Sequence, residues 1–286
     1  MPSAEFRFDA IGAPWRIDTA SPLSDALKTA IAERIDAFDR TWSRFRDDSL
    51  VTRISTEAGS WRFPPEAAAL FALYRRLYEA TAGAVSPLVG ARLENLGYDR
   101  AYSLTPAAQG VSVPAWDDAV AWDGETLTCV RPVLLDVGAA GKGYLVDIVA
   151  EMLADDGITE YVVDASGDLV HRGDTPLRIA LEDPRNPRKA IGVYTLQNAA
   201  LAASASNRRA WGTNHHIIDG ITGLPTSEVV ATWAVASSGL DADGLATGLF
   251  FRGAAAFTPT FDFQYVRMFS RGTVEFSRDF QGEMFT

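Results

Sequence analysis

Residues 136–147 read D-V-G-A-A-G-K-G-Y-L-V-D, a glycine-rich turn that carries one lysine. The apolar run 133–137 leads into this turn and predicts a strand, and apolar residues from Tyr144 to Leu153 recur at helical spacing before Gly157. Backbone amides at the start of a helix can hold an anion. Many folds that bind no ligand also need glycine in a turn between a strand and a helix, for steric reasons. The turn alone therefore does not decide whether a ligand binds here.

Spacing excludes the two common nucleotide-binding motifs at this turn. A P-loop would place glycine at position 136 and serine or threonine after the lysine, where this chain has Asp136 and Gly143. The dinucleotide fingerprint G-x-G-x-x-G is not reproduced by Gly138, Gly141 and Gly143. We therefore expect neither a P-loop fold nor a Rossmann fold.

Outward from the turn, helical and strand-like patterns alternate irregularly. Helices are predicted from Ser21-Pro22, from Pro64-Pro65 and from near Asp241, while residues 82–98 look irregular. Asp123-Gly124 is a good hairpin turn, and two further strands are expected at the end of the chain. This order indicates a mixed α/β fold without internal repeats, either one domain over 1–286 or two closely packed lobes. The other predicted strands lie at 105–132, 161–165, 177–183, 191–196 and 228–236.

Composition and charge limit the function. The chain has 286 residues, of which 47% are hydrophobic and 22% charged, as in ordinary globular proteins. Its net charge of -11 disfavours nonspecific binding to nucleic acid or anionic lipid. An acidic protein that binds a polyphosphate would recruit a divalent cation. The single cysteine, Cys129, cannot form an internal disulfide, and a structural zinc site is not expected.

The first twenty residues carry several charges and no continuous apolar segment, so no signal peptide or lipoprotein leader is expected. No run is long and apolar enough to span a bilayer. The sequence thus predicts a cytoplasmic protein without membrane insertion.

Two further segments carry chemistry. N-H-H-I-I-D-G at 214–220 holds a paired histidine, and the residues alone leave open whether His215 and His216 act in a site or only solvate a turn. In D-A-D-G-L-A-T at 241–247, Asp243 and Thr247 are four residues apart, so they share one helix face and offer hard oxygen ligands for magnesium. The alternative for the second segment is a plain helix start, with Asp241 or Asp243 as N-cap.

In this order, six segments resemble the FAD:protein FMN transferase (ApbE) family along nearly the whole chain. That resemblance implies a compact, T-fold-like arrangement of β-sheets and helices around a central FAD cleft. It implies magnesium-dependent transfer of the FMN moiety of FAD to a threonine of a target flavoprotein, with release of AMP. The segments are W-S-R-F-R-D-D-S-L-V-T-R-I (42–54), G-A-V-S-P-L-V-G (83–90), L-D-V-G-A-A-G-K-G-Y-L-V-D (135–147), V-V-D-A-S-G-D-L (162–169), H-I-I-D-G-I-T-G-L-P (216–225) and A-D-G-L-A-T-G-L-F (242–250).

The resemblance also implies roles for individual residues. Asp243 and Thr247 match the family's magnesium ligands, with a third oxygen from Ala139, and His216 matches the motif histidine expected to orient or deprotonate the threonine. Asp243 is counted with His216 as catalytic. Asp219 is expected to orient His216 or to cap the turn. Positions that match flavin contacts are Ile11, Phe45, Ala84, Val85, Ser86, Asp136, Lys142 and Ile217.

Several positions depart from the family pattern, including Ser86, which stands where the family usually has Asp. Two alternatives therefore remain beside transfer to a soluble acceptor flavoprotein: a magnesium-dependent FAD pyrophosphatase and a non-catalytic FAD-binding protein. Arg208-Arg209 is interpreted as an exposed charged turn, with contact to a phosphate or to a partner as the alternative. The other departures are Ser166, Ala203, Ala205 and Gly220.

Overall fold

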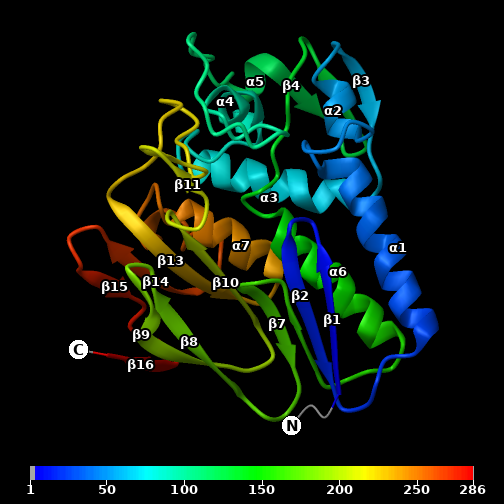
Figure 1. Ribbon diagram of the computed structural model, residues 1–286, viewed down its shortest axis with the longest axis vertical. Helices are drawn as coiled ribbons and strands as arrows, with labels where there is room; N and C mark the ends of the chain where they lie inside the picture. Colours follow the sequence, from blue (N-terminus) through cyan, green and yellow to red (C-terminus); the bar gives the residue numbers. More distant parts are fainter. Residues whose placement is uncertain (1–3, 286) are drawn as a thin grey trace.

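The framework of the protein, described by a computed structural model over residues 4–285, is an eight-stranded antiparallel sheet. Its neighbouring strands come from the beginning, the middle and the end of the chain, so the sheet joins distant segments (Figure 1). In spatial order the strands are β1 (Ala4–Ala10), β2 (Ala13–Thr19), β6 (Tyr161–Asp164), β7 (Asp168–Arg172), β10 (Ala200–Ala205), β13 (Val229–Ala236), β14 (Gln264–Phe269) and β15 (Val274–Phe276).

Both faces of this sheet are covered. The central strand β13 is buried along almost its whole length, which explains its continuous apolar sequence V-V-A-T-W-A-V-A. Trp233 and Val235 pack with residues of a small sheet on one face, while Ala234 and Ala236 belong to the core under the helices. The smaller sheets consist of β16 (Gly282–Met284), β9 (Asn186–Leu196) and β8 (Leu177–Asp183); of β3 (Gly59–Arg62), β5 (Thr126–Cys129) and β4 (Val120–Trp122); and of β11 (Ala210–Trp211) and β12 (Asn214–His215).

Helices form the opposite layer. Leu145 of α6 and Leu245 of α7 lie in one hydrophobic cluster with Val163 and Ala202 of the large sheet. Figure 1 shows α3 crossing the molecule above α7, with α2, α4 and α5 beyond it. The helices are α1 (Asp25–Trp42), α2 (Leu50–Ile54), α3 (Ala67–Ala80), α4 (Gly90–Asn95), α5 (Trp116–Ala119), α6 (Gly141–Asp155) and α7 (Gly239–Gly248), with 3-10 turns η1 (Pro87–Val89) and η2 (Ala254–Ala256).

Helices α6 and α7 meet backbone to backbone. A Cβ on Gly143 would overlap the carbonyl oxygen of Gly239, so both positions need glycine. Asp147 of α6 also caps α7: its two carboxylate oxygens accept hydrogen bonds from the amides of Gly239 (2.7 Å) and Leu240 (2.8 Å). The start of α7 is therefore fixed to the first two turns of α6.

Most predicted elements are confirmed, with shifted boundaries. The first helix begins at Asp25 rather than at Ser21-Pro22, because the side chain of Ser24 caps it by accepting a hydrogen bond from the amide of Leu27 (3.1 Å). The predicted helix near Asp241 is capped by Ser238, so neither Asp241 nor Asp243 is its N-cap.

Three predictions about elements are wrong. Residues 133–137 form no strand: the amides of Val133 and Asp136 donate isolated backbone hydrogen bonds to the carbonyls of Ile54 (3.4 Å) and Pro87 (2.8 Å), and the segment joins no ladder of the described chain. Residues 82–98 are not irregular throughout, because η1 and α4 lie within them. The chain closes with three further strands rather than two. Among residues 4–285, none of the helices combines the length and hydrophobicity that crossing a bilayer requires.

Candidate active site

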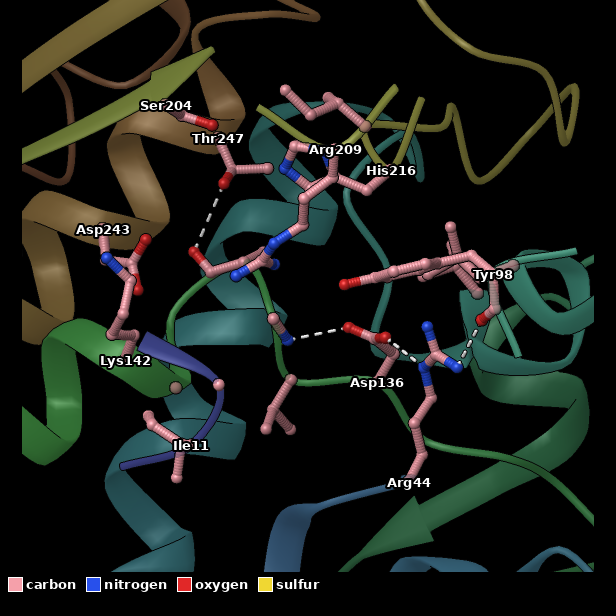
Figure 2. A pocket seen from close by; sticks show the side chains of 18 of the residues that line it. Ile11, Arg44, Tyr98, Asp136, Lys142, Ser204, Arg209, His216, Asp243 and Thr247 are labelled. Carbon is pink, nitrogen blue, oxygen red and sulfur yellow. Dashed lines mark hydrogen bonds and ion pairs between the residues drawn. The ribbon is translucent and has the colours of Figure 1, made fainter. Parts of the chain in front are cut away.

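A cavity of about 740 Å³ lies where the glycine turn, α7, β10 and the segments after β1 and α1 converge (Figure 2). Every residue predicted for the site lines it, although these residues are spread over most of the chain. They are Ile11, Phe45, Ala84, Val85, Ser86, Asp136, Ala139, Lys142, His216, Ile217, Asp243 and Thr247.

The three predicted metal ligands are grouped on one side of the cavity. The hydroxyl of Thr247 donates a long hydrogen bond to the carbonyl oxygen of Ala139 (3.4 Å), and Asp243 lies one turn earlier on α7. One Asp243 carboxylate oxygen accepts a hydrogen bond from the amide of Gly143 (2.9 Å). The glycine turn thus brings its own carbonyl to the carboxylate and hydroxyl of α7.

The electrostatic setting of Asp243 suits a cation. Burial raises the pKa of this carboxyl, the Asp168 carboxylate raises it further, and Lys142 only partly opposes them. Carboxylate, hydroxyl and carbonyl oxygens are ligands that magnesium prefers, so these residues fit that ion. Among residues 4–285 no group of three or more His, Cys, Asp or Glu side chains is placed to hold a metal.

Lys142 is engaged within the protein. Its ammonium group lies 2.8 Å from a carboxylate oxygen of Asp168 and donates to the carbonyl of Ala165 (2.8 Å). Asp168 is only 1% exposed and faces the cavity, yet the sequence-based prediction of the site did not include it. Its signal was the final Asp of the segment V-V-D-A-S-G-D-L. Lys142 therefore neutralises a buried carboxylate and lines the cavity at the same time.

Asp136 is paired with an arginine that the sequence did not single out. Burial alone would raise the pKa of Asp136, but the Arg44 guanidinium (2.6 Å) and the Gly138 amide (2.7 Å) hold it below its usual value. Arg44 is 2% exposed, donates to the carbonyl of Tyr98 (2.7 Å), and lies over the rings of Phe45 and Tyr98. Arg44 lies next to Phe45 in the family-like segment 42–54, so the sequence could have pointed to it.

The paired histidines have separate roles. His215 is bonded on both ring nitrogens, to the carbonyl of Thr226 (2.6 Å) and to the amide of Ile217 (3.2 Å), so it holds the loop. His216 lines the cavity, and its Nδ1 is buried without a hydrogen-bond partner. Burial, with Arg209 and His215 nearby, lowers the pKa of His216 to about 3, so the imidazole is neutral at pH 7.

The remaining predicted flavin positions form the cavity wall. Ile11 has a φ of 45° in the turn between β1 and β2, a strained conformation for a β-branched residue of the kind that clusters at functional sites. Ala84, Val85 and Ile217 are buried. Ser86, where the family usually has Asp, caps η1 by accepting a hydrogen bond from the amide of Leu88 (3.2 Å).

Two other predictions in the loops have distinct outcomes. Asp219 accepts hydrogen bonds from the amides of Ile221 (2.7 Å) and Thr222 (3.2 Å), so it caps the turn, and it does not line the cavity. Arg208 forms an ion pair with Glu182 (2.9 Å), which agrees with the predicted charged turn. Arg209 is exposed in the same turn, as predicted, and its side chain also extends into the cavity (Figure 2).

Comparison with known proteins agrees with this geometry. The family model described as the ApbE family matches residues 11–263. The chain belongs to the ApbE family. The match begins at Ile11 and continues past Thr247, so every predicted site residue of this ApbE-family chain lies within it.

Individual relatives of this ApbE-family chain were compared over most of its length. It is 26% identical over 264 residues to an FAD:protein FMN transferase of Klebsiella pneumoniae, covering 84% of this chain and 75% of the relative. It is 29% identical over 254 residues to an FAD:protein FMN transferase of Vibrio cholerae, covering 80% and 74%. The solved structure of the flavin transferase ApbE from Vibrio cholerae superposes with a TM-score of 0.81 at 25% identity, covering 98% of this chain and 99% of that one. The expected fold is thereby confirmed.

Proposed function

We propose that this protein is an FAD:protein FMN transferase that moves the FMN moiety of FAD to a threonine of an acceptor flavoprotein, releases AMP and depends on magnesium. Relatives of that name match most of the chain. The observation that carries the proposal is the grouping of the Ala139 carbonyl, Asp243 and Thr247 in one cavity with a histidine whose Nδ1 has no partner. Such a cavity offers metal ligands and a proton acceptor together.

In this reaction the threonine oxygen attacks the phosphorus of the FMN phosphate. A new phosphorus–oxygen bond forms, the bond to the bridging oxygen breaks, and AMP leaves with that oxygen. The Ala139 carbonyl, Asp243 and Thr247 would hold magnesium, which when bound neutralises pyrophosphate charge as a Lewis acid. The protein's own residues orient the substrate and accept the hydroxyl proton.

His216 is the residue suited to that proton. Because its pKa is low, the imidazole is neutral and its free Nδ1 can accept a hydrogen bond from the threonine hydroxyl. An anionic ligand in the cavity favours the imidazolium, so its binding raises the proton affinity of His216. His216 is therefore a better base with the dinucleotide bound than without it.

The direct test follows the products of FAD with and without an acceptor. The purified protein is incubated with FAD, magnesium and candidate soluble proteins that carry a flavin-attachment threonine. Covalent flavin fluorescence on one of them, a mass increase of one FMN, and one AMP released per label are expected. If FAD is split into FMN and AMP while no protein is labelled, the protein is a pyrophosphatase; if FAD stays intact, it is a binding protein.

Replacing His216 by alanine is expected to lower the rate of transfer at saturating FAD by roughly a hundredfold, as loss of a general base does. Added imidazole should restore part of the rate, because it can occupy the vacated space. Initial rates of acceptor labelling measure both effects. A loss smaller than about threefold would remove His216 from proton transfer, since general-base catalysis contributes more than that.

The soluble acceptor flavoprotein, the cytoplasmic location and the organisation as one domain or two closely packed lobes stay predictions from the sequence.

A further inference from the structure

One basic side chain of the cavity differs from all the others. Among the described residues that line it, four of the five lysine and arginine side chains have a carboxylate within ion-pair distance, and the fifth, Arg209, has none. The paired ones are Arg44 with Asp136 (2.6 Å), Arg46 with Asp48 (2.7 Å), Lys142 with Asp168 (2.8 Å) and Arg208 with Glu182 (2.9 Å).

The place of Arg209 is set by its backbone. Its carbonyl accepts a hydrogen bond from the amide of His216 (3.2 Å), so the turn that carries Arg209 is tied to the residue with the free imidazole nitrogen. Figure 2 shows the side chain extending from this turn toward the middle of the cavity, between Thr247 and Tyr98 in this view. Its charge acts on several sides of the cavity, because it lowers the pKa of His216, of Asp136 and of Asp243.

The guanidinium of Arg209 is exposed to the cavity and has no partner within the described chain. The chain has an excess of carboxylates, with a net charge of -11, that could have paired with it. Arg208 is paired with Glu182, whereas the guanidinium of Arg209 forms no hydrogen bond or ion pair with any residue between 4 and 285. A free guanidinium presents planar, paired donors that match the oxygens of a phosphate.

We propose that Arg209 is a phosphate-binding residue of this site, which contacts the pyrophosphate of the dinucleotide. This inference rests on the proposed function for the identity of the dinucleotide. It assigns the charge that meets the phosphates to Arg209 rather than to Lys142, whose ammonium group is held by Asp168 and the Ala165 carbonyl. The arginine also lies beside His216, so it can stabilise negative charge near the proton acceptor.

The test compares Arg209→Gln with the matched variant Arg185→Gln, which removes the same charge from an exposed arginine that is paired with Asp183 (3.2 Å) and does not line the cavity. Binding of FAD, FMN and riboflavin is measured by flavin fluorescence and titration calorimetry, with a chelator and then with magnesium. For Arg209→Gln we expect about tenfold weaker FAD binding, because a charge-assisted hydrogen bond is lost. FMN binding should weaken too, while riboflavin, which has no phosphate, should bind within about twofold of wild type because it lacks the group that the arginine recognises. Arg185→Gln should leave all three affinities unchanged.

Melting temperatures keep the comparison interpretable. Because the Arg209 side chain has no partner in the described chain, Arg209→Gln should melt like the wild type. Unchanged FAD affinity, an equal loss of riboflavin affinity, or an equal effect of Arg185→Gln would each overturn the inference. If Arg209→Gln binds FAD more weakly than the wild type, as expected, but the wild type labels no acceptor, the transferase proposal is wrong and the phosphate contact stands. If the wild type labels an acceptor and Arg209→Gln binds FAD as tightly as the wild type, the transferase activity stands and the phosphate contact of Arg209 is wrong.

Discussion

Asp243→Asn should reduce FAD turnover about a thousandfold or more, because the metal ligands supply several kcal/mol of charge stabilisation to the transition state. The amide is nearly isosteric and can still accept the hydrogen bond from the amide of Gly143, so α7 should stay in place. FAD binding measured with a chelator should change little. Rates of AMP release at saturating FAD and magnesium measure the effect.

The matched control is Asp241→Asn on the same helix. Asp241 is directed to Arg76 (3.6 Å) and does not line the cavity, so this variant should keep the wild-type rate. A similar loss in both variants would show that the effect arises from disturbance of α7. A rate within about tenfold of wild type for Asp243→Asn would contradict its role as a metal ligand, since tenfold corresponds to only about 1.4 kcal/mol.

Asp243→Asn should also stabilise the protein when no metal is present. Burial and the Asp168 carboxylate raise the pKa of Asp243, so the folded protein binds a proton there more tightly than the unfolded chain does. The free energy of unfolding therefore falls as pH rises from the ordinary carboxyl pKa toward the raised one. Asparagine does not ionise and removes this decline. Melting in chelator at neutral pH should show a higher Tm for Asp243→Asn, while magnesium should stabilise only the wild type.

Arg44→Met should lower the free energy of unfolding by about 3–5 kcal/mol, because it leaves a buried carboxylate without its cation. The guanidinium is almost fully buried, is bonded to Asp136 and to the Tyr98 carbonyl, and lies over two aromatic rings. Methionine fills part of the volume but offers Asp136 no hydrogen bond. Urea unfolding of both proteins at neutral pH measures the difference.

Two comparisons isolate the cause. Arg40→Met removes an arginine whose pair with Asp36 (2.8 Å) is exposed, and we expect it to cost at most about 1 kcal/mol. The double variant Arg44→Met, Asp136→Asn should recover part of the loss, since no charge is then buried alone. A single-variant loss no larger than that of Arg40→Met would show that Asp136 does not depend on Arg44.

The helices were predictable where apolar spacing was long and regular. Leu27, Ile31 and Ile35 repeat over α1 and all are buried. The run 133–137 was misassigned because an apolar sequence indicates burial but not strand pairing. A strand also needs a neighbouring strand, and the run itself does not show whether one is present. The short helix α4 has too few residues for its period to show.

Some residues of the site were predictable from local sequence and others were not. Asp243 and Thr247 were predictable because four residues bring two side chains to one helix face, and Ala139 followed from the glycine turn. Asp168 and Arg44 stand in motif-bearing segments but were not singled out, since their importance depends on partners that are distant in the chain. The importance of Arg209 depends on its having no partner within the described residues. Local sequence gives the type of a side chain, while tertiary contacts decide whether its charge is free.

The scattered origin of the cavity has a consequence during synthesis. The wall begins with Ile11, in the first turn of the chain, and is completed only by Asp243 and Thr247 on α7. A ribosome that has translated as far as Ile218 therefore carries a chain with the predicted flavin contacts but without the carboxylate and hydroxyl of α7. A nascent chain cannot assemble the metal site before α7 has left the exit tunnel, so loading with metal has to follow translation of nearly the whole protein.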